Sequence, residues 1–328
     1  MSGVSDAEPP MTSEPALVLL DRWRRDLAAW AIPDHIRSQV SQSPWVLPRQ
    51  MFARRAERQV RQPFGISFER ERTALEPPGE VLDVGAGAGA ACLPLAPHAT
   101  RITAVDVDHE MLGMLTASAA RLGTPAAAVA GRWPDVAGEV GAADVVTCHH
   151  VLYNVADLEP FVTMLTKRAR WRVVVEITRH HPLAALNELW ERFHGLRRPD
   201  GPTAADAVAI LTALGLGVTA EAWTRPPTSE YASFAELAEV TRRRLCLPPE
   251  RGGEVEAALR ESGADSGYLL DIGSSGRDLV TIWWPGAASE SPGAASESPG
   301  AAKRLSPGVT SAGLTRSPGP ASPRRPGA

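Results

Sequence analysis

Residues 81–90 constrain the fold of this chain more than any other segment. They read Val-Leu-Asp-Val-Gly-Ala-Gly-Ala-Gly-Ala, so an apolar run leads directly into a turn in which every second residue is glycine. Glycine lets a backbone turn tightly and approach a ligand with no Cβ in between. A helix that follows such a turn directs its free N–H groups at the ligand. We therefore expect a strand, a ligand-binding turn and a helix from about Gly89.

Asp106 indicates that the ligand contains a ribose. It ends a second apolar run, seventeen residues after Gly89. In a strand–helix–strand unit this position lies beside the first turn, where a carboxylate accepts hydrogen bonds from both ribose hydroxyls. Asp106 or Asp108 is also suited to cap the helix that contains Met111. We assign the capping role to Asp108 and the ribose to Asp106.

Short apolar runs alternate with helical stretches along the middle of the chain. We expect strands over residues 81–84, 101–105, 126–130, 143–148, 171–177, 217–223 and 278–284. Beyond the helix from Gly89, we expect helices over residues 110–122, 158–168, 182–194, 204–214, 233–245 and 253–262. This alternation predicts an α/β fold with a doubly wound, mostly parallel sheet.

The two ends of the chain differ from this pattern. Residues 1–15 are polar and contain three prolines, so we expect them to be disordered. Residues 16–78 carry apolar residues at helical spacing between prolines, which predicts an N-terminal helical cap before the domain of residues 79–284. Residues 285–328 are rich in Gly, Ala, Ser and Pro and repeat the heptapeptide PGAASES. They lack large apolar residues, which predicts a disordered tail.

Composition narrows the class of protein. The formal net charge is -4, which does not favour a nucleic-acid partner, because nucleic acid normally requires a strongly basic face. The three cysteines show no CxxC spacing, so we expect neither a disulfide framework nor a zinc site. No apolar run approaches the length of a membrane span, and the N-terminus is acidic rather than basic. We expect a cytoplasmic protein with no membrane partner.

The glycine turn alone does not distinguish two nucleoside cofactors. Residues 85–90 satisfy the dinucleotide pattern G-x-G-x-x-G/A, with Ala90 in the last place. Asp83 argues against a dinucleotide, because an acid two residues before the first glycine is poorly placed beside an anionic pyrophosphate. S-adenosylmethionine carries an ammonium and a sulfonium, and an acid near the turn suits these positive groups.

Residues 81–107 resemble the class I S-adenosylmethionine-dependent methyltransferases. The first motif of that family is an acid, any residue and Gly-x-Gly-x-Gly, and Asp83 to Gly89 matches it, while Asp106 matches the acid that closes the second strand. The resemblance implies S-adenosyl-L-methionine as cofactor and a seven-stranded sheet whose last strand is antiparallel. It also implies that Asp106 holds the ribose and that Val107 lies against the adenine. The expected cofactor site comprises Asp83, Gly85, Ala86, Gly87, Gly89, Asp106, Val107, Arg132 and Trp133.

One position departs from the family pattern. Many members have an aspartate after the third strand that bonds the adenine amino group, whereas this chain has Ala130-Gly131-Arg132-Trp133. Trp133 either stacks on the adenine, because an aromatic face suits a flat base, or packs half-buried in the core.

The fourth expected strand ends at the candidate catalytic residues. In the family that the chain resembles, the position of His149 faces the methyl group, so His149 is a candidate general base or a group that orients the substrate. A contact with the cofactor or a helix cap is the alternative role. Tyr153 is a candidate to line the substrate pocket. The Asn/Asp-Pro-Pro-aromatic motif of nucleic-acid amino methylases is absent here.

These features predict methyl transfer to a small molecule, with no metal. The paired histidines 149–150 and 180–181 lack the spacing that brings ligands to one ion. We expect the N-terminal helices and residues 182–202 to bind the acceptor, and the candidate wall residues are Trp30, Trp45, Phe52, Trp190 and Phe193. Two alternatives are a nicotinamide-dependent oxidoreductase, which a parallel last strand would favour, and a protein that binds S-adenosylmethionine without catalysis.

Overall fold

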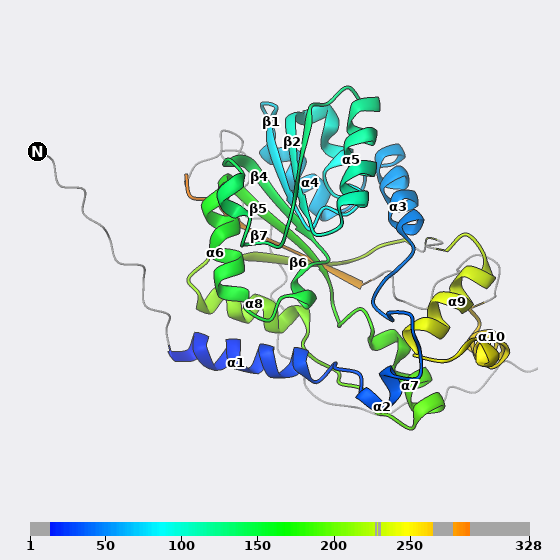
Figure 1. Cartoon of the computed structure of the whole chain (residues 1–328). Helices are drawn as coiled ribbons and strands as arrows, with labels where there is room; N and C mark the ends of the chain where they lie inside the picture. Colours follow the sequence, from blue (N-terminus) through cyan, green and yellow to red (C-terminus); the bar gives the residue numbers. More distant parts are fainter. Residues whose placement is uncertain (1–13, 227, 229–230, 265–277, 289–328) are drawn as a thin grey trace, which may run out of the picture.

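A seven-stranded sheet forms the centre of the protein (Figure 1). The computed structural model describes residues 14–226, 228, 231–264 and 278–288. The strands are β1 Gly79–Val84, β2 Ala99–Asp106, β3 Ala126–Ala130, β4 Ala143–His149, β5 Ala169–Thr178, β6 Thr219–Thr224 and β7 Asp278–Pro285. They lie in the order β3-β2-β1-β4-β5-β7-β6.

The directions of the strands confirm the predicted sheet. Strands β1 to β5 pair in parallel, whereas β7 runs antiparallel to both β5 and β6. A dinucleotide-binding sheet of the order 3-2-1-4-5-6 has no such reversed strand. The topology therefore argues against the nicotinamide alternative and agrees with the antiparallel last strand that the resemblance implied.

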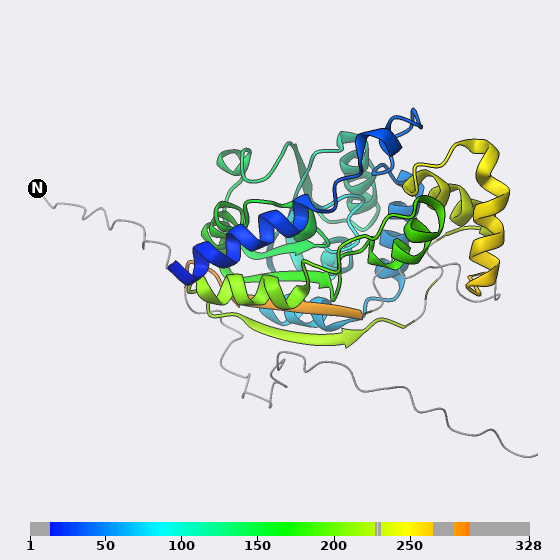
Figure 2. The ribbon, with the colours of Figure 1, turned by 90° about the horizontal axis from the view of Figure 1, so that it is seen from below.

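Helices cover both faces of the sheet. Helices α6 Leu158–Arg168 and α8 Ala204–Ala213 pack on one face, and α1 Glu14–Ala28 lies along α8 (Figure 2). The other face is covered by α4 Ile66–Ala74 and α5 His109–Arg121, with α3 Arg49–Arg61 beyond them. Because the central strands are buried on both sides, they are nearly continuous apolar runs, as in Val173–Val175.

A third apolar cluster gathers the remaining helices at one end of the molecule (Figure 1). These helices are α2 Asp34–Arg37, α7 Asn187–His194, α9 Phe234–Arg244 and α10 Gly252–Glu261. Short 3-10 helices η1 to η5 cover Leu93–His98, Ala137–Glu139, Leu152–Asn154, Ala184–Leu186 and Pro249–Arg251. No helix in the described part of the chain has both the length and the apolarity that crossing a membrane requires.

The N-terminal helices are part of the sheet layers. Helix α4 contacts β4, β5 and β7 directly, and α1 buries Leu20 and Trp23 against the opposite face. Residues 1–13 of the segment expected to be disordered lie outside the described residues, but Glu14 and Pro15 already belong to α1. Proline is tolerated there because the first helical turn has no intrahelical partner for its nitrogen.

Two local predictions are wrong. The segment after Gly89 forms turns and the 3-10 helix Leu93–His98 instead of an α-helix, since Pro94 and Pro97 interrupt regular hydrogen bonding. The tail begins later than Pro285: that residue ends β7, and the next three N–H groups donate to the carbonyls of residues 169–171. Residues 289–328 lie outside the described residues.

Candidate active site

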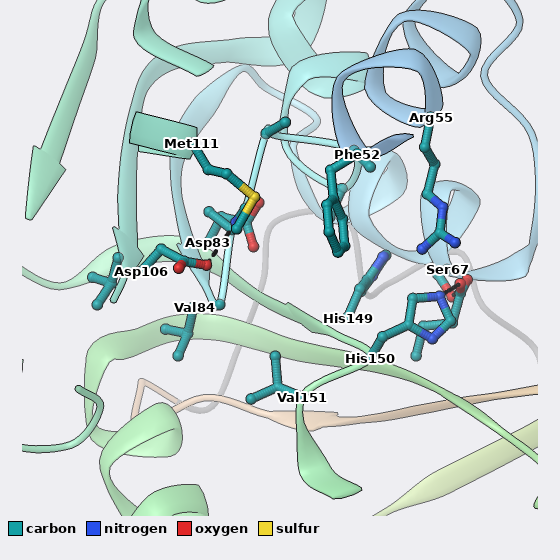
Figure 3. Close-up of a pocket in the computed structure, with 18 of the residues that line it drawn as sticks. Phe52, Arg55, Ser67, Asp83, Val84, Asp106, Met111, His149, His150 and Val151 are labelled. Carbon is teal, nitrogen blue, oxygen red and sulfur yellow. Dashed lines mark hydrogen bonds and ion pairs between the residues drawn. The ribbon is translucent and has the colours of Figure 1, made fainter. Parts of the chain in front are cut away.

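A cavity of about 460 Å³ opens beyond the carboxyl ends of the parallel strands (Figure 3). The loops after β1, β2, β3 and β4 line one side of it, and side chains of α3 and α4, among them Phe52, Arg55 and Ser67, close the other. Ligands of open α/β sheets bind in this place. The volume is in the range of small-molecule sites, about 300–1,000 Å³.

The glycine turn forms the floor of the cavity. Gly85, Gly87 and Gly89 have φ values of 76°, 51° and 90°, which L side chains rarely adopt. A Cβ on Gly85 would lie 2.3 Å from Cγ2 of Val151, and one on Gly89 would lie 2.7 Å from the Leu93 side chain. This turn therefore requires glycine both for its conformation and for its packing.

Replacing Gly85 by alanine should destabilise the protein by about 1–2 kcal/mol, because the left-handed backbone disfavours a Cβ. The expected fall in melting temperature is roughly 2–8 °C, measured by thermal unfolding. Gly138→Ala is the matched control, since a Cβ there meets no atom within 4 Å. Equal melting temperatures for the two variants would contradict this account of the turn.

Asp106 organises the turn from the end of β2. Its Oδ2 accepts the N–H of Gly87 at 2.8 Å, and its Oδ1 accepts the N–H of Asp108 at 2.9 Å. Asp108 caps α5 as predicted, with Oδ1 accepting the N–H groups of Glu110 and Met111. Each carboxylate oxygen of Asp106 retains a further lone pair for a ligand in the cavity.

Asp83 is a buried acid without a strong partner. It is 1% exposed, and neither carboxylate oxygen has a hydrogen-bond partner among the described residues. Burial raises the pKa of Asp83 to about 7; the neighbouring Cys92 thiol and the charge of His149 lower it, and the carboxylates of Glu71 and Asp106 raise it further. Because an unpaired buried carboxylate is costly, this site suits a cationic group of a ligand.

The remaining residues that were predicted to bind the cofactor also line the cavity. Ala86, Val107, Arg132 and Trp133 all line the cavity. Val107 is 69% exposed, so an apolar side chain lies open at the edge of the cavity. Trp133 is buried, and its indole N–H donates to the Phe161 carbonyl at 3.2 Å. The structure thus makes Trp133 a core residue that also contributes to the cavity wall.

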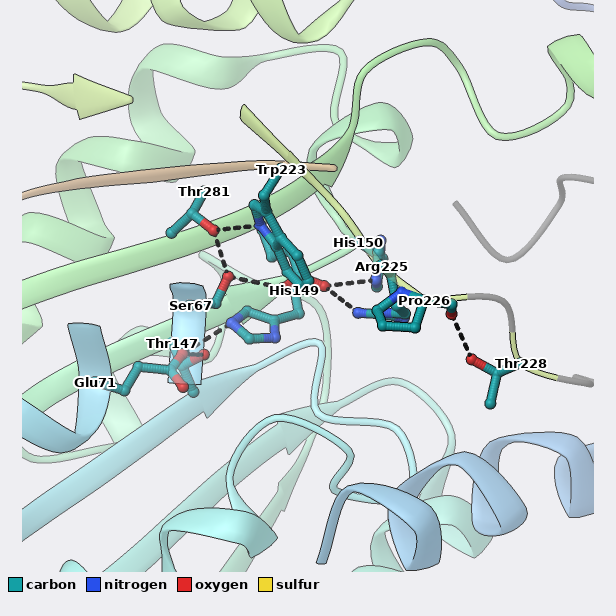
Figure 4. Close-up of polar contacts among 11 residues, drawn as sticks. Ser67, Glu71, Thr147, His149, His150, Trp223, Arg225, Pro226, Thr228 and Thr281 are labelled. Atoms are coloured by element: carbon teal, nitrogen blue, oxygen red, sulfur yellow. Dashed lines mark hydrogen bonds and ion pairs between the residues drawn. The ribbon is translucent and has the colours of Figure 1, made fainter. Parts of the chain in front are cut away.

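His149 belongs to a group of polar side chains that includes Glu71 and Thr147 (Figure 4). Its Nε2 lies 2.8 Å from Oε1 of Glu71, and the Thr147 hydroxyl donates to the same oxygen at 2.5 Å. Burial disfavours the charged imidazole, but the Glu71 carboxylate outweighs this effect and raises the pKa of His149 to about 9. His149 is therefore protonated at neutral pH.

Glu176 is the centre of a second polar group. Its Oε2 accepts the Ser67 hydroxyl at 2.7 Å, and its Oε1 accepts Nη2 of Arg225 at 2.6 Å and lies 3.1 Å from Nε2 of His150. Although burial opposes ionisation, Arg225 holds the pKa of Glu176 well below its usual range. The Ser67 hydroxyl also forms a hydrogen bond with the Thr281 hydroxyl. The Thr281 hydroxyl oxygen in turn accepts the indole N–H of Trp223.

The structure does not place Tyr153 at this site, contrary to prediction. The 3-10 turn Leu152–Asn154 directs its ring into the core, where it stacks on Trp23 with ring centroids 5.8 Å apart. Its hydroxyl donates to the Thr178 carbonyl at 2.8 Å, and burial raises the pKa of the phenol. Tyr153 therefore packs the fold rather than facing an acceptor.

Of the five aromatic residues expected to form the acceptor wall, Phe52 lines the cavity. Trp30 stacks on His181 with centroids 3.9 Å apart, and Trp190 is buried in the third apolar cluster. The residues missed by sequence analysis are Ser67, Glu71, Glu176 and Arg225. Among the described residues no three His, Cys, Asp or Glu side chains gather as a metal site.

The topology and the site together define a class of enzyme. A sheet with an antiparallel β7, a three-glycine turn after β1 and an acid at the end of β2 characterise the class I S-adenosylmethionine-dependent methyltransferases. The chain matches a family of methyltransferase domains over residues 52–213. It belongs to this class, and its cofactor is S-adenosyl-L-methionine.

Solved structures provide further comparisons. The chain is similar to the YcgJ protein from Bacillus subtilis, with 17% identity, a TM-score of 0.44 and coverage of 67% of this chain and 97% of that one. The magnesium protoporphyrin IX methyltransferase from Synechocystis PCC 6803 has 19% identity, a TM-score of 0.40 and coverage of 63% and 88%. A methyltransferase from Thiobacillus denitrificans has 18% identity, a TM-score of 0.42 and coverage of 73% and 98%. No curated protein sequence matches the chain significantly.

Proposed function

We propose that this enzyme transfers the methyl group of S-adenosylmethionine to a small molecule held between the glycine turn and helices α3 and α4. One observation carries the proposal: the cofactor loops and the buried polar groups around His149 and Glu176 line one cavity of about 460 Å³. A cavity of this size suits a small acceptor rather than a macromolecule. The net charge of -4 also does not favour nucleic acid.

Each end of the cofactor has matching groups in the cavity. Asp106 binds the ribose hydroxyls, and the unpaired carboxylate of Asp83 binds the ammonium. Val107 and Trp133 flank the adenine beside Arg132. Gly85, Ala86 and Gly87 line the cavity and allow close approach of the backbone, whereas Gly89 packs against Leu93 and supports the turn from behind. Bound S-adenosylmethionine supplies a methyl group that is already activated on a sulfonium.

The protein contributes alignment and exclusion of water. In-line positioning accounts for much of the acceleration of a displacement reaction. Helices α3 and α4 close the acceptor side, where Phe52 and Phe68 exclude water. His149 is protonated at neutral pH, so it orients an acceptor atom by donating a hydrogen bond, rather than removing a proton.

The affinity for S-adenosylhomocysteine should depend on pH through Asp83. In the free protein the pKa of Asp83 is about 7, and the ionised form binds the ammonium. Below pH 7 binding must first release a proton, so affinity should be about tenfold weaker at pH 6 than at pH 8. Calorimetric titration at both pH values measures this ratio. Asp83→Asn should bind weakly with no such dependence, and a pH-independent wild type would contradict the assignment.

Incubation with methyl-labelled S-adenosylmethionine tests the proposed acceptor class. The protein is given a mixture of small metabolites, protein and nucleic acid, and the label is followed into each fraction. We expect label among the small molecules and much less with His149→Ala. Label in protein or nucleic acid alone would overturn the small-molecule acceptor. Binding of the cofactor with no transfer to any fraction would favour the non-catalytic alternative.

A further inference from the structure

His149 and His150 both line the cavity, but different charges surround their two imidazole rings (Figure 3). Nε2 of His150 lies 3.1 Å from Oε1 of Glu176. The same oxygen already accepts a hydrogen bond from Nη2 of Arg225 at 2.6 Å. The guanidinium therefore balances the charge of the Glu176 carboxylate, whereas the Glu71 carboxylate holds a proton on His149.

The groups around His150 keep its ring neutral at pH 7. Burial lowers the pKa of His150, and the charges of Arg55 on α3 and Arg225 after β6 lower it further. The Glu176 carboxylate on β5 opposes them without reversing the direction. Since Nε2 faces this carboxylate, we infer that Nε2 carries the hydrogen of the neutral ring. Nδ1 then keeps a lone pair that accepts a proton.

The backbone holds the ring of His150 in an unusual position. Its φ is 60°, in the left-handed region that residues other than glycine seldom occupy. Its N–H donates to the Glu176 carbonyl at 2.7 Å, so both its backbone and its ring are held against Glu176. The side chain is 27% exposed, so the ring remains accessible from the cavity. Strained backbone that neighbouring contacts maintain is concentrated at functional sites.

Building on the proposed function, we propose that His150 is the general base of the methyl transfer and that the acceptor group is a hydroxyl. A hydroxyl oxygen accepts one hydrogen bond while its own hydrogen is donated to another group. It therefore fits between the protonated His149, which donates, and the neutral His150, which accepts. An ammonium group has no lone pair with which to accept from His149.

The protons and electrons of this step balance. Nδ1 of His150 takes the hydroxyl proton while a lone pair of the hydroxyl oxygen forms a bond to the methyl carbon. The bond between that carbon and sulfur breaks, and its electron pair stays on sulfur. The products are a methyl ether, S-adenosylhomocysteine and one proton. Glu176 stabilises the His150 imidazolium until this proton passes to water.

The pH dependence of methyl transfer tests His150 as the base. The full-length protein is incubated with saturating methyl-labelled S-adenosylmethionine and the mixture of small metabolites, from pH 6 to pH 9. The wild-type rate should be level above pH 7, where the imidazole is neutral. His150→Asn tolerates the left-handed backbone and should lower the rate at pH 7 about a hundredfold or more. Its residual rate should rise about tenfold per pH unit, because hydroxide must then remove the proton.

The controls separate a base from a structural residue. His150→Asn should bind S-adenosylhomocysteine as the wild type does. His35→Asn is the matched control, because His35 is exposed on α2, and it should keep the wild-type rate and pH profile. A rate of His150→Asn within threefold of the wild type would overturn the proposal. A lowered rate with the wild-type pH profile would do the same, since it would reveal a structural role alone.

Two measurements on the wild type need no variant. Nuclear magnetic resonance of the imidazole nitrogens at pH 7 should show His150 with Nε2 protonated and Nδ1 unprotonated, and protonation of both would contradict the proposal. The chemical shift of an isotopically labelled methyl carbon should place it on oxygen, and a methyl group on nitrogen or carbon would exclude the hydroxyl acceptor. If the wild type transfers no label at any pH, the proposed function itself is overturned.

Discussion

Replacing Asp106 by alanine should lower the affinity for S-adenosylhomocysteine by a factor of about 100 or more. Hydrogen bonds to a charged group contribute roughly 1.5–3 kcal/mol each, and the ribose offers two hydroxyls. A loss of about 3 kcal/mol corresponds to more than a hundredfold in affinity. The variant also deprives the Gly87 N–H of its acceptor at 2.8 Å, which loosens the turn that faces the cofactor.

Two further variants test whether the loss of affinity is specific to the carboxylate of Asp106. Asp106→Asn keeps one carbonyl oxygen and should lie between the wild type and the alanine variant. Asp157→Ala removes the same charge from an exposed residue that pairs with Arg24, and its affinity for S-adenosylhomocysteine should equal that of the wild type. Calorimetric titration gives all four affinities. Micromolar binding by Asp106→Ala would show that the ribose lies elsewhere.

Replacing Glu71 by glutamine should destabilise the protein by about 3 kcal/mol at pH 7, because removing one partner leaves a buried charge uncompensated. The side chain of Glu71 is 1% exposed and that of His149 is 16% exposed. The expected fall in melting temperature is on the order of 6–12 °C. Glu69→Gln is the matched control on the same helix, since Glu69 is exposed and its pair with Arg72 lies at the surface.

The pH dependence of stability tests whether His149 is the partner of Glu71 in this buried ion pair. Its pKa is raised to about 9 in the folded protein, so its contribution is complete below its unfolded value, near 6.5, and is lost as pH rises through 9. The difference in melting temperature between the wild type and Glu71→Gln should therefore shrink from pH 7 to pH 9.5. A difference that stays constant over this range would exclude the ion pair as its cause.

Features encoded by neighbouring residues were predictable from sequence. The apolar runs located all seven strands to within a few residues, and the positive φ values of Gly85, Gly87 and Gly89 follow from the turn that the glycines predicted. Asp108 caps α5 because an aspartate beside the first helical turn accepts its free N–H groups. The direction of β7 followed from the family resemblance rather than from periodicity.

Contacts between distant segments were not predictable in the same way. Glu71 meets Thr147 across 76 positions and Ser67 meets Glu176 across 109, and both acceptors sit on segments whose local pattern indicates only a helix or a strand. A glutamate in a short helix is normally solvated, so nothing local marked Glu71. Glu176 did carry a signal, because it interrupts the apolar run from Val173 to Ile177, where a charge must be buried and paired.

Two predictions were wrong because they relied on local sequence alone: the α-helix after Gly89 and the position of Tyr153 beside the acceptor. A strand followed by a glycine turn favoured an α-helix, but Pro94 and Pro97 restrict that segment to 3-10 geometry. Tyr153 follows the candidate catalytic residue closely in sequence, yet the 3-10 turn at Leu152–Asn154 places its ring in the apolar core, stacked on Trp23. Proximity in sequence thus did not imply proximity to the acceptor.

Calorimetric titration of the wild-type protein with S-adenosylhomocysteine, and separately with NADH, shows which of the two cofactors the cavity binds. We expect one S-adenosylhomocysteine bound per chain with micromolar affinity, and no binding of NADH at the same concentrations. The unpaired carboxylate of Asp83 favours the cationic ligand and disfavours the anionic pyrophosphate. Binding of NADH without S-adenosylhomocysteine would contradict the assignment of the cavity.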